Sequence, residues 1–316
     1  MFIARCIGVS LAEFVILYLS LSLLVARFWR HGLGWLDSGS ARASETLLFA
    51  VRTLPLLGSA LFTLAFTVPS FLILEPRTTD EEVGIAPALL AACFLGFLVW
   101  GILRAVATQR RTSRTVSEWL SGATAVPADA TVPVFRTCQH APALTVAGLG
   151  SPRVLVSETA YSVLTQHELS IALRHELAHV RWHDNWKKLV FRVLEFPGMS
   201  ALESAWSEKA EMAADDAAVS NFDDALDLAS ALIKLSRLAP VQCDAELATG
   251  LLHSSPASLS VRVRRLFQWN QPDRTIRHRS NWMLLLPAVA MILTTVALNY
   301  SFVLIQMHAV TEWLVQ

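Results

Sequence analysis

The chain has 316 residues, of which 53% are hydrophobic and only 16% are charged, and its 26 basic residues balance its 26 acidic ones. This composition is typical of a membrane protein and disfavours a soluble globular one. Without a basic excess, direct nucleic-acid binding is not expected, and four cysteines without a C-x-x-C pair exclude a disulfide framework.

Four apolar stretches are long enough to cross a bilayer, which takes ~20 residues. They are residues 2–29, 47–74, 86–107 and 282–305. The first is too long for the apolar part of a signal peptide, carries Glu13, and has its larger basic group after the apolar run. We therefore predict four transmembrane helices.

The distribution of charge around the spans predicts their orientation, because cytoplasmic loops hold the excess of Lys and Arg. Basic residues follow the first and third spans and precede the fourth, whereas acidic residues follow the second. The basic residues are Arg27, Arg30, Arg42, Arg104, Arg110, Arg111, Arg114, Arg274, Arg277 and Arg279, and the acidic ones are Glu75, Asp80, Glu81 and Glu82. This pattern predicts a multi-pass inner (plasma) membrane protein with both termini outside.

Three regions follow from these spans. Residues 1–107 form a membrane domain with three helices, residues 108–281 form a cytoplasmic domain, and residues 282–316 form the fourth helix and a short external tail. Glu13 falls near mid-membrane, where an ionisable side chain is a candidate functional group. The alternative is that it is protonated, or hydrogen-bonded to Thr294 or Thr295 in the fourth span.

The cytoplasmic part opens with a basic amphipathic extension of the third span, residues 109–120, and a linker at residues 121–129. Short strands rich in Val, Leu and Thr follow, punctuated by Gly and Pro. They are residues 131–135, 143–148 and 153–157. Helical patterns dominate after them, so we predict an α+β domain.

The segment from Ala172 to Asn185, A-L-R-H-E-L-A-H-V-R-W-H-D-N, contains H-E-x-x-H. A capping box of Thr165 and Glu168 predicts a helix here. In a helix, His175 and His179 lie one turn apart on one face and can share a Zn²⁺, while Glu176 reaches its bound water. The alternative is a surface helix that matches the motif by chance.

A zinc site with two His needs a third protein ligand, and a carboxylate is the expected type. The predicted helix at residues 201–219 carries Glu211 and Asp215 at i and i+4, on one face. We predict Glu211 as the third ligand and Asp215 as a residue that orients a ligating His. Glu208 is the alternative ligand. His183 lies ~12 Å from His175 along a straight helix, too far to share the ion.

Three further helical segments carry no such motif. Residues 185–196 mix basic and apolar side chains and lie either on the membrane surface or with a basic face in water. Residues 223–238 form an amphipathic helix. Residues 258–269 include S-V-R-V-R-R-L, whose arginines either contact lipid or pair within the domain.

The run H-E-L-A-H-V-R-W-H-D-N, the later E-M-A-A-D and the S-V-R-V-R-R-L segment, with three spans before and one after, resemble the membrane zinc peptidases of the β-lactam sensor-transducer (BlaR/MecR) type. The chain is also similar to the heat-shock and CAAX-processing membrane endopeptidases. By layout the resemblance covers most of the chain, and by specific motif only a short part. It implies a gluzincin-like metallopeptidase domain between the third and fourth transmembrane helices of a mainly α-helical protein.

The resemblance assigns His175, His179 and Glu211 to zinc, Glu176 to the catalytic base and Asp215 to the trailing acid. It also places a substrate-aligning strand before the motif, for which the candidate residues are Leu144, Thr145, Val146 and Ala147. The β-lactam receptors continue into an extracellular penicillin-binding domain and this chain stops, so direct antibiotic sensing is not expected.

The expected function is zinc-dependent cleavage of a protein substrate on the cytoplasmic side, such as a transcriptional repressor. One alternative is a quality-control protease for membrane proteins, and another is a membrane signalling or scaffold protein with a silent protease domain. The expected partners are a protein substrate and the lipid bilayer. The sequence gives no indication of the oligomeric state or the activating signal.

Overall fold

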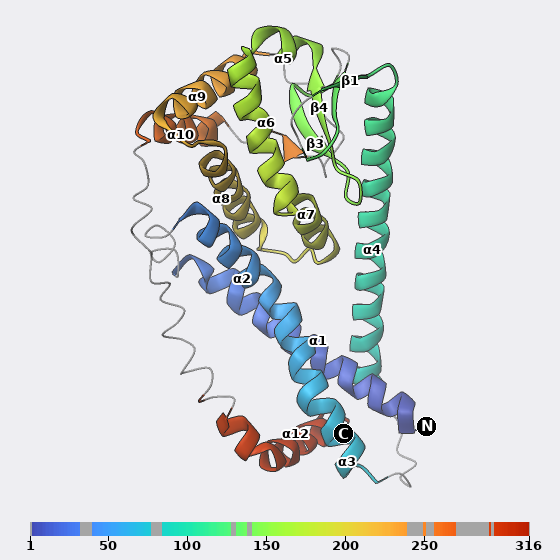
Figure 1. Cartoon of the computed structure of the whole chain (residues 1–316). Helices are drawn as coiled ribbons and strands as arrows, with labels where there is room; N and C mark the ends of the chain where they lie inside the picture. Colours follow the sequence, from blue (N-terminus) through green and yellow to red (C-terminus); the bar gives the residue numbers. More distant parts are fainter. Residues whose placement is uncertain are drawn as a thin grey trace. The chain divides into compact units, whose positions relative to one another are not determined.

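The computed structural model of the chain describes residues 2–31, 40–76, 84–127, 131–137, 141–238, 249–250, 256–269, 291 and 294–315. This part is mainly helical, with one small sheet (Figure 1). The chain divides into two compact units. The first comprises residues 1–35, 50–100 and 275–316, and the second comprises residues 36–49 and 101–274. The predicted division at residues 107 and 281 follows the membrane spans and stays a prediction, whereas the compact units group residues 36–49 with the second unit.

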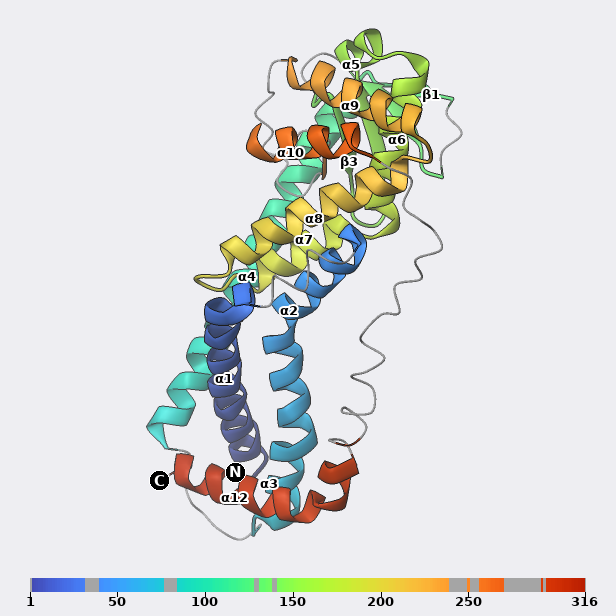
Figure 2. The ribbon, with the colours of Figure 1, turned by 90° about the vertical axis from the view of Figure 1, so that its left-hand side faces the viewer.

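The first unit is built from apolar helices. In chain order they are α1 (Phe2–Phe28), the later part of α2 (Ala41–Phe62), the π-helical η2 (Thr63–Thr67), α3 (Val68–Leu74), the first part of α4 (Ile85–Leu120) and α12 (Tyr300–Val315). α1 contacts both η2 and α3, and α12 packs against the same two elements (Figure 2). Pro55 lies within α2 and Pro69 in the first turn of α3.

Three helical stretches in the described part of the chain are long and apolar enough to cross a membrane: Phe2–His31, Ala41–Leu74 and Pro87–Leu120. Large apolar side chains remain exposed along them, among them Leu23, Leu61 and Trp100. Such faces are expected where lipid is the solvent. The first three predicted spans thus correspond to apolar helices.

The first part of the fourth predicted span, residues 282–290, lies outside the described residues, as do residues 292–293, Arg274, Arg277, Arg279 and the acidic residues 80–82. Its end is described and differs from the prediction, because α12 continues to Val315. The tail expected after Ile305 is therefore helical, and its apolar run Ala309–Val310 gives no signal to end the helix.

The second unit contains a five-stranded sheet of order β1-β2-β4-β3-β5. Its strands are β1 (Thr124–Val126), β2 (Val134–Thr137), β3 (Leu144–Ala147), β4 (Arg153–Ser157) and β5 (Thr249–Gly250). β2 runs parallel to β4, and the other neighbours are antiparallel. The second and third predicted strands correspond to β3 and β4, whereas the first is shifted, because β2 starts at Val134 instead of residue 131. β1 falls in the expected linker, because three residues without strong alternation give too little signal.

Both faces of this sheet are covered. Val154 and Val156 of β4 face a core shared with α6 and α9, while Leu155 faces Val116 and Trp119 near the end of α4. Alternate residues of a strand point to opposite faces, so a strand covered on both sides is apolar throughout. The predicted extension of the third span is thus a continuous part of α4 that closes one face of the sheet.

The remaining helices of the second unit are α5 (Glu158–Val163), α6 (Gln166–Arg181), α7 (Asp184–Val193), α8 (Ser200–Ala218), α9 (Phe222–Ser236) and α10 (Pro256–Phe267). α6 lies between the sheet and α8, and it also contacts α9 (Figure 1). This central helix carries the H-E-x-x-H motif.

α6 ends before residue 183, so the chain does not continue to that residue as one straight helix. His183 adopts a left-handed conformation, with φ 58° and ψ 38°, and α7 starts at Asp184. The assumption of a straight helix through residue 183 was therefore wrong. His183 is nevertheless exposed, so its side chain stays outside the buried site described below.

Candidate metal centre

The capping box predicted for α6 is present, and its Glu168 is buried. The Thr165 hydroxyl accepts from the Glu168 N–H, and the Glu168 carboxylate accepts from the Thr165 N–H. The same carboxylate accepts from Lys234 and Ser230 of α9 at 2.7 and 2.6 Å. The start of the motif helix is thus fixed to a neighbouring helix, which sets the rotation of its buried face.

That buried face carries the motif. His175 and Glu176 are 0% exposed and His179 is 3% exposed. A surface helix that matched the motif by chance would leave these polar groups in water, because burying them costs free energy unless they are paired. Their burial indicates that they have partners inside the protein.

One partner comes from α8. Ala210, Ala213 and Ala214 are buried on this helix, and such small side chains allow α6 and α8 to approach closely. Glu211, on the same buried face, is 5% exposed and points at the two imidazoles. Glu208, the alternative ligand, is exposed.

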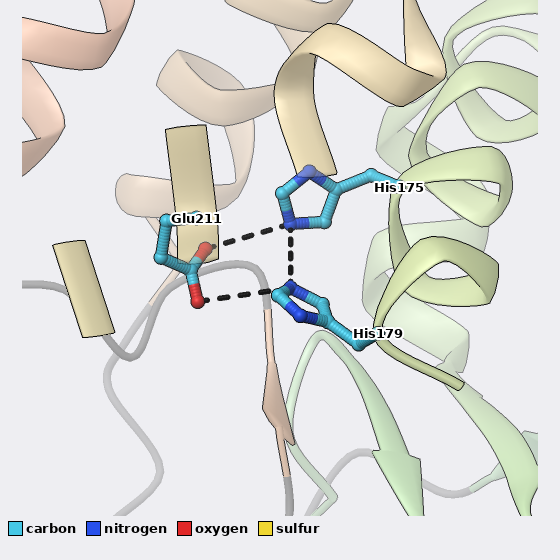
Figure 3. Close-up of side chains that lie close together, drawn as sticks. All are labelled: His175, His179 and Glu211. Carbon is cyan, nitrogen blue, oxygen red and sulfur yellow. Dashed lines mark hydrogen bonds and ion pairs between the residues drawn. The ribbon is translucent and has the colours of Figure 1, made fainter. Parts of the chain in front are cut away.

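The three side chains converge on one point (Figure 3). His175 Nε2 lies 3.2 Å from His179 Nε2 and 3.5 Å from Glu211 Oε2, and His179 Nε2 lies 3.7 Å from Glu211 Oε1. A tetrahedral Zn²⁺ with bonds of ~2.0–2.1 Å separates its ligand atoms by about 3.3 Å. The three donors therefore have the spacing and the chemical type that zinc requires.

Both imidazoles are oriented by a carboxylate on the opposite ring nitrogen. His175 Nδ1 lies 3.0 Å from Asp215 Oδ1, and His179 Nδ1 lies 2.7 Å from Asp184 Oδ2. An imidazole that donates its Nδ1 proton presents a lone pair at Nε2. Two such lone pairs face each other at 3.2 Å, an arrangement that a cation or a shared proton between them stabilises.

Each of these two aspartates is in turn paired with a buried or half-buried cation. Arg262 of α10, 0% exposed, donates to Asp215 through Nε at 2.8 Å and Nη2 at 2.7 Å, and its Nη1 lies 3.0 Å from Glu211 Oε2. Lys187 of α7 donates to Asp184 at 2.8 Å. Of the two explanations for the basic segment of α10, pairing within the domain is correct for Arg262 and for Arg265, which pairs with Asp216.

The acid–base properties of the metal-free site follow from this pairing. Burial lowers the pKa of His175, but hydrogen bonds to Asp215 and Glu211 outweigh burial and raise it to about 9. Burial raises the pKa of Glu211, but the charge of Arg262 and the bond to His175 hold it at about 2. The pKa of Asp215 is likewise held well below its usual range despite burial, chiefly by Arg262. The carboxylates are therefore charged at neutral pH.

The charge of Lys188, next to Lys187 on α7, also interacts with the acidic side chains of the site. Burial lowers the pKa of its ammonium group, and the negative charges of Glu211, Asp184 and Glu176 act in the opposite direction. The sequence motif gives no role to Asp184, Lys187, Lys188 or Arg262. An acid shortly after the second His and a basic residue one turn later were the available signals.

The start of α7 is tied to the sheet as well. Asn185 Nδ2 donates to the carbonyls of Val146 and Gly148 at 3.5 and 3.4 Å, and Trp186 Nε1 donates to Leu149 at 3.0 Å. Gly148 has φ 103°, a conformation that favours glycine. β3 and the turn after it thereby hold the segment that carries Asp184.

The candidate substrate strand corresponds to β3, residues Leu144, Thr145, Val146 and Ala147. One edge of β3 pairs with β4. Its other edge pairs with β5 through Thr145 and Val146. An extended peptide that bound along this edge would have to take the place of β5.

Glu13 is in the first unit, 4% exposed on α1, and has no part in this centre. α1 contacts η2 there, and Thr67 of η2 is also buried. Of the partners predicted for Glu13, Thr295 donates its hydroxyl to the Met291 carbonyl of its own segment instead.

The first unit also brings together Glu75, His308 and Glu312. His308 Nε2 lies 3.4 Å from Glu312, and Nδ1 lies 3.8 Å from Glu75. Arg5 already pairs with Glu75 at 2.9 Å, so a guanidinium supplies positive charge to this group. The presence of Arg5 in this group therefore favours ion pairing over metal binding.

Comparisons with known proteins add no family assignment to this geometry. A scan against models of known protein families finds no match, and a search of curated proteins finds none either.

Proposed function

We propose that the chain is an integral-membrane zinc endopeptidase that cleaves protein substrates on the cytoplasmic side, in the manner of the sensor-transducer peptidases it resembles. The observation that carries the proposal is the convergence of His175, His179 and Glu211 at ligand spacing, with Glu176 buried beside them. A scaffold with a silent domain needs neither the three ligands nor a buried carboxylate next to them.

The chemistry that zinc supplies in such a site is Lewis acidity, which acidifies a coordinated water and polarises the scissile carbonyl. Glu176 accepts a proton as the water oxygen attacks the peptide carbon, and it then gives that proton to the departing amide nitrogen. The C–N bond breaks, and the second proton of the water passes from the new carboxylic acid to the amine, so the products are a carboxylate and an ammonium group. Asp215 and Asp184 keep the imidazole Nδ1 protons in place, so that both Nε2 atoms stay available as ligands.

The cytoplasmic location is proposed from the distribution of basic residues around the spans. A substrate on that side is a soluble or membrane-bound cytoplasmic protein, and a repressor or another signalling protein is the proposed class. A quality-control protease would instead cut many unrelated membrane proteins. The number of distinct substrates therefore separates the two uses.

The test uses the full-length protein in detergent, with wild type, Glu176→Gln, Glu211→Ala and the exposed control Glu118→Gln. Zinc content and cleavage of labelled β-casein are measured for each. We expect Glu176→Gln to keep zinc and lose cleavage by a factor of at least ~10², because general acid–base groups contribute about that much. Glu211→Ala should lose zinc, and Glu118→Gln should match wild type.

Proteomics of cells that carry Glu176→Gln identifies the substrates. One or a few proteins that accumulate uncut indicate a regulatory protease, and many indicate quality control. Wild-type protein without zinc, or a Glu176→Gln variant that cleaves as fast as wild type, would contradict the proposal.

A further inference from the structure

A glutamate of α2 lies buried in the same unit as the metal centre. Glu45 is 0% exposed, and residues 36–49 belong to the unit that contains α6, α7 and α8. The helix that carries it starts at Ala41 and is part of the second apolar stretch, Ala41–Leu74. A buried carboxylate costs free energy unless donors surround it, so its partners indicate what it does.

Both carboxylate oxygens of Glu45 accept hydrogen bonds. Oε1 accepts from Lys187 and from the indole of Trp206, each at 2.7 Å, and Oε2 accepts from Arg42 at 2.6 Å. Trp206 is 2% exposed on α8, and the Arg42 guanidinium lies 4.3 Å from the ring centroid of Trp182, directly after α6. The first turns of α2 therefore contact α7, α8 and the residue directly after α6.

From Glu45 a continuous series of charged hydrogen bonds leads to the candidate metal ligand. Lys187 Nζ donates to Glu45 at 2.7 Å and to Asp184 at 2.8 Å, and Asp184 accepts from His179 Nδ1 at 2.7 Å. Asp184 is 1% exposed. Charge-assisted bonds in a buried setting hold their partners in fixed directions.

Lys187 is shared between two carboxylates, and this sharing fixes its position. Without Glu45, the ammonium group would be free to follow Asp184 or to swing toward solvent, because a lysine side chain has four flexible carbons. Asp184 would then lose a fixed donor, and the imidazole of His179 would lose a fixed acceptor. Residues that support a metal ligand in this way change metal affinity or activity when they are replaced.

We infer that Glu45 is a positioning residue of the metal centre, which sets the orientation of His179 through Lys187 and Asp184. The inference rests on the proposed function for its effect on catalysis, but the orientation of His179 does not depend on it. The second apolar helix then helps to position the metal centre, a role that the motif residues alone do not indicate.

The experiment compares Glu45→Gln, Lys187→Met and the double variant in full-length protein, with Glu118→Gln as the matched control. The first readout is metal-independent: the ¹⁵N resonances of His179 in metal-free protein, assigned with a His179→Gln sample. The second is the affinity for Co²⁺ and its visible absorption spectrum, which reports ligand geometry. The third is kcat and KM for labelled β-casein.

We expect Glu45→Gln to shift the Nδ1 resonance of His179, to weaken Co²⁺ binding by about tenfold, and to lower kcat with little change in KM. In the Lys187→Met background, Glu45→Gln should have no further effect, since it acts through Lys187. Lys187→Arg keeps the cation and should restore the Co²⁺ spectrum, which supports the inference even if Glu45→Gln fails to fold.

Wild-type His179 resonances and Co²⁺ affinity in Glu45→Gln would overturn the inference, as would effects of Glu45 and Lys187 that simply add. Wild-type protein that binds no metal and cleaves nothing would instead contradict the proposed function. The resonances of His179 would still decide whether Glu45 positions it.

Discussion

At the residue scale, the candidate centre is organised around two histidines with the same kind of support. Each imidazole contacts an aspartate at Nδ1, and each aspartate contacts a cation from another position in the chain, Arg262 or Lys187. Opposite charges therefore alternate outward from the site. This alternation lets Asp215, Glu211 and Asp184 lie buried near one point, each beside a cation.

Removing one member of such a buried pair is costly. Arg262→Met should destabilise the protein by about 3–5 kcal/mol, because Asp215 and Glu211 would lose the buried guanidinium that compensates their charge. Arg262→Lys should recover part of this loss, since lysine keeps the charge but cannot bind a carboxylate with two parallel bonds. Thermal unfolding in detergent measures the effect, and Arg264→Met, exposed on the same helix, should match wild type. Equal melting temperatures for Arg262→Met and Arg264→Met would contradict the pairing.

Metal binding should release about one proton near neutral pH. In the metal-free site the pKa of His175 is raised to about 9 and that of Glu211 is lowered to about 2, so His175 carries a proton and Glu211 does not. A metal must displace that proton, so affinity should rise about tenfold per pH unit below pH 9 and level off above it. Calorimetry in buffers of different ionisation enthalpy counts the proton. A count of zero at pH 7.5 would contradict the raised pKa.

The motif predicts which residues form the candidate metal centre, but it does not predict which residues orient them and pair with them. H-E-x-x-H spacing places His175 and His179 on one helical face, and the i, i+4 spacing does the same for Glu211 and Asp215. Asp184 and Arg262 could not be assigned in this way. Their roles depend on the helix break at His183 and on the contact between α9 and α10, which brings distant residues together.

At the element scale, α6 depends on its first turn. Burial raises the pKa of Glu168, but bonds from Lys234, Ser230 and the Thr165 N–H outweigh it, and the pKa lies below its usual value. A lowered pKa means that the ionised carboxylate stabilises the fold above the unfolded-state pKa of about 4.3, and that this stability is lost as pH falls through the folded-state pKa.

Glu168→Gln should therefore lower stability at pH 7 by about 1–2 kcal/mol, a typical cost for a cap with charged bonds. The difference from wild type should shrink as the pH falls below the unfolded-state pKa of about 4.3 and then through the lowered pKa of folded Glu168. Unfolding curves at several pH values provide the measurement. A difference that stayed constant down to low pH would show that the carboxylate charge is unimportant.

The contact of α4 with α7 depends on one glycine. A Cβ at Gly101 would lie 2.4 Å from the Val193 carbonyl oxygen at the end of α7, whereas a Cβ at Gly96 would meet nothing within 4 Å. Gly101→Ala should destabilise the protein by about 1–3 kcal/mol, as overpacking does. Gly96→Ala, one and a half turns away, should be neutral or slightly stabilising. Melting temperatures compare the two, and similar values would rule out the close contact.

Long periodic elements were predictable and short ones were not. The apolar helices and α6, α8 and α9 follow from periodicity and capping, whereas β1 and β5 are too short to show a pattern. β5 pairs with β3 from more than a hundred residues further along the chain. No local signal specifies such a partner.

At the scale of the whole molecule, the charge distribution and the hydropathy together predict which ends of the helices face the cytoplasm. Reporter fusions after Glu75 should give active alkaline phosphatase, which folds outside, and fusions after Leu120 should give fluorescent green fluorescent protein, which reports the cytoplasm. The reason is that the basic residues flank one side of the spans. The opposite pattern of activities would place the metal centre outside and would exclude cytoplasmic substrates.

The division into two units could not be predicted from the boundaries of apolar stretches. α2 and α4 each contribute residues to both units, since residues 41–49 and 101–120 belong with the sheet and α6. Hydropathy marks where lipid contact is favourable, but it does not mark where a helix packs against other elements. Leu48 and Ala105 show this, because both lie inside predicted spans, 47–74 and 86–107, and both are buried in the second unit.

The left-handed conformation of His183, between α6 and α7, determines how Asp184 comes to contact His179. In an uninterrupted helix, a residue five positions after His179 would point about 140° away from it. The left-handed conformation of His183 breaks the helix and brings Asp184 within 2.7 Å of His179, at a conformational cost of roughly 1–2 kcal/mol for a residue with a Cβ. The spacing H-x-x-x-x-D is therefore compatible with this support only if the helix ends between the two residues. In other chains, Gly or Asn directly before such an acid would be a searchable sign of the same arrangement.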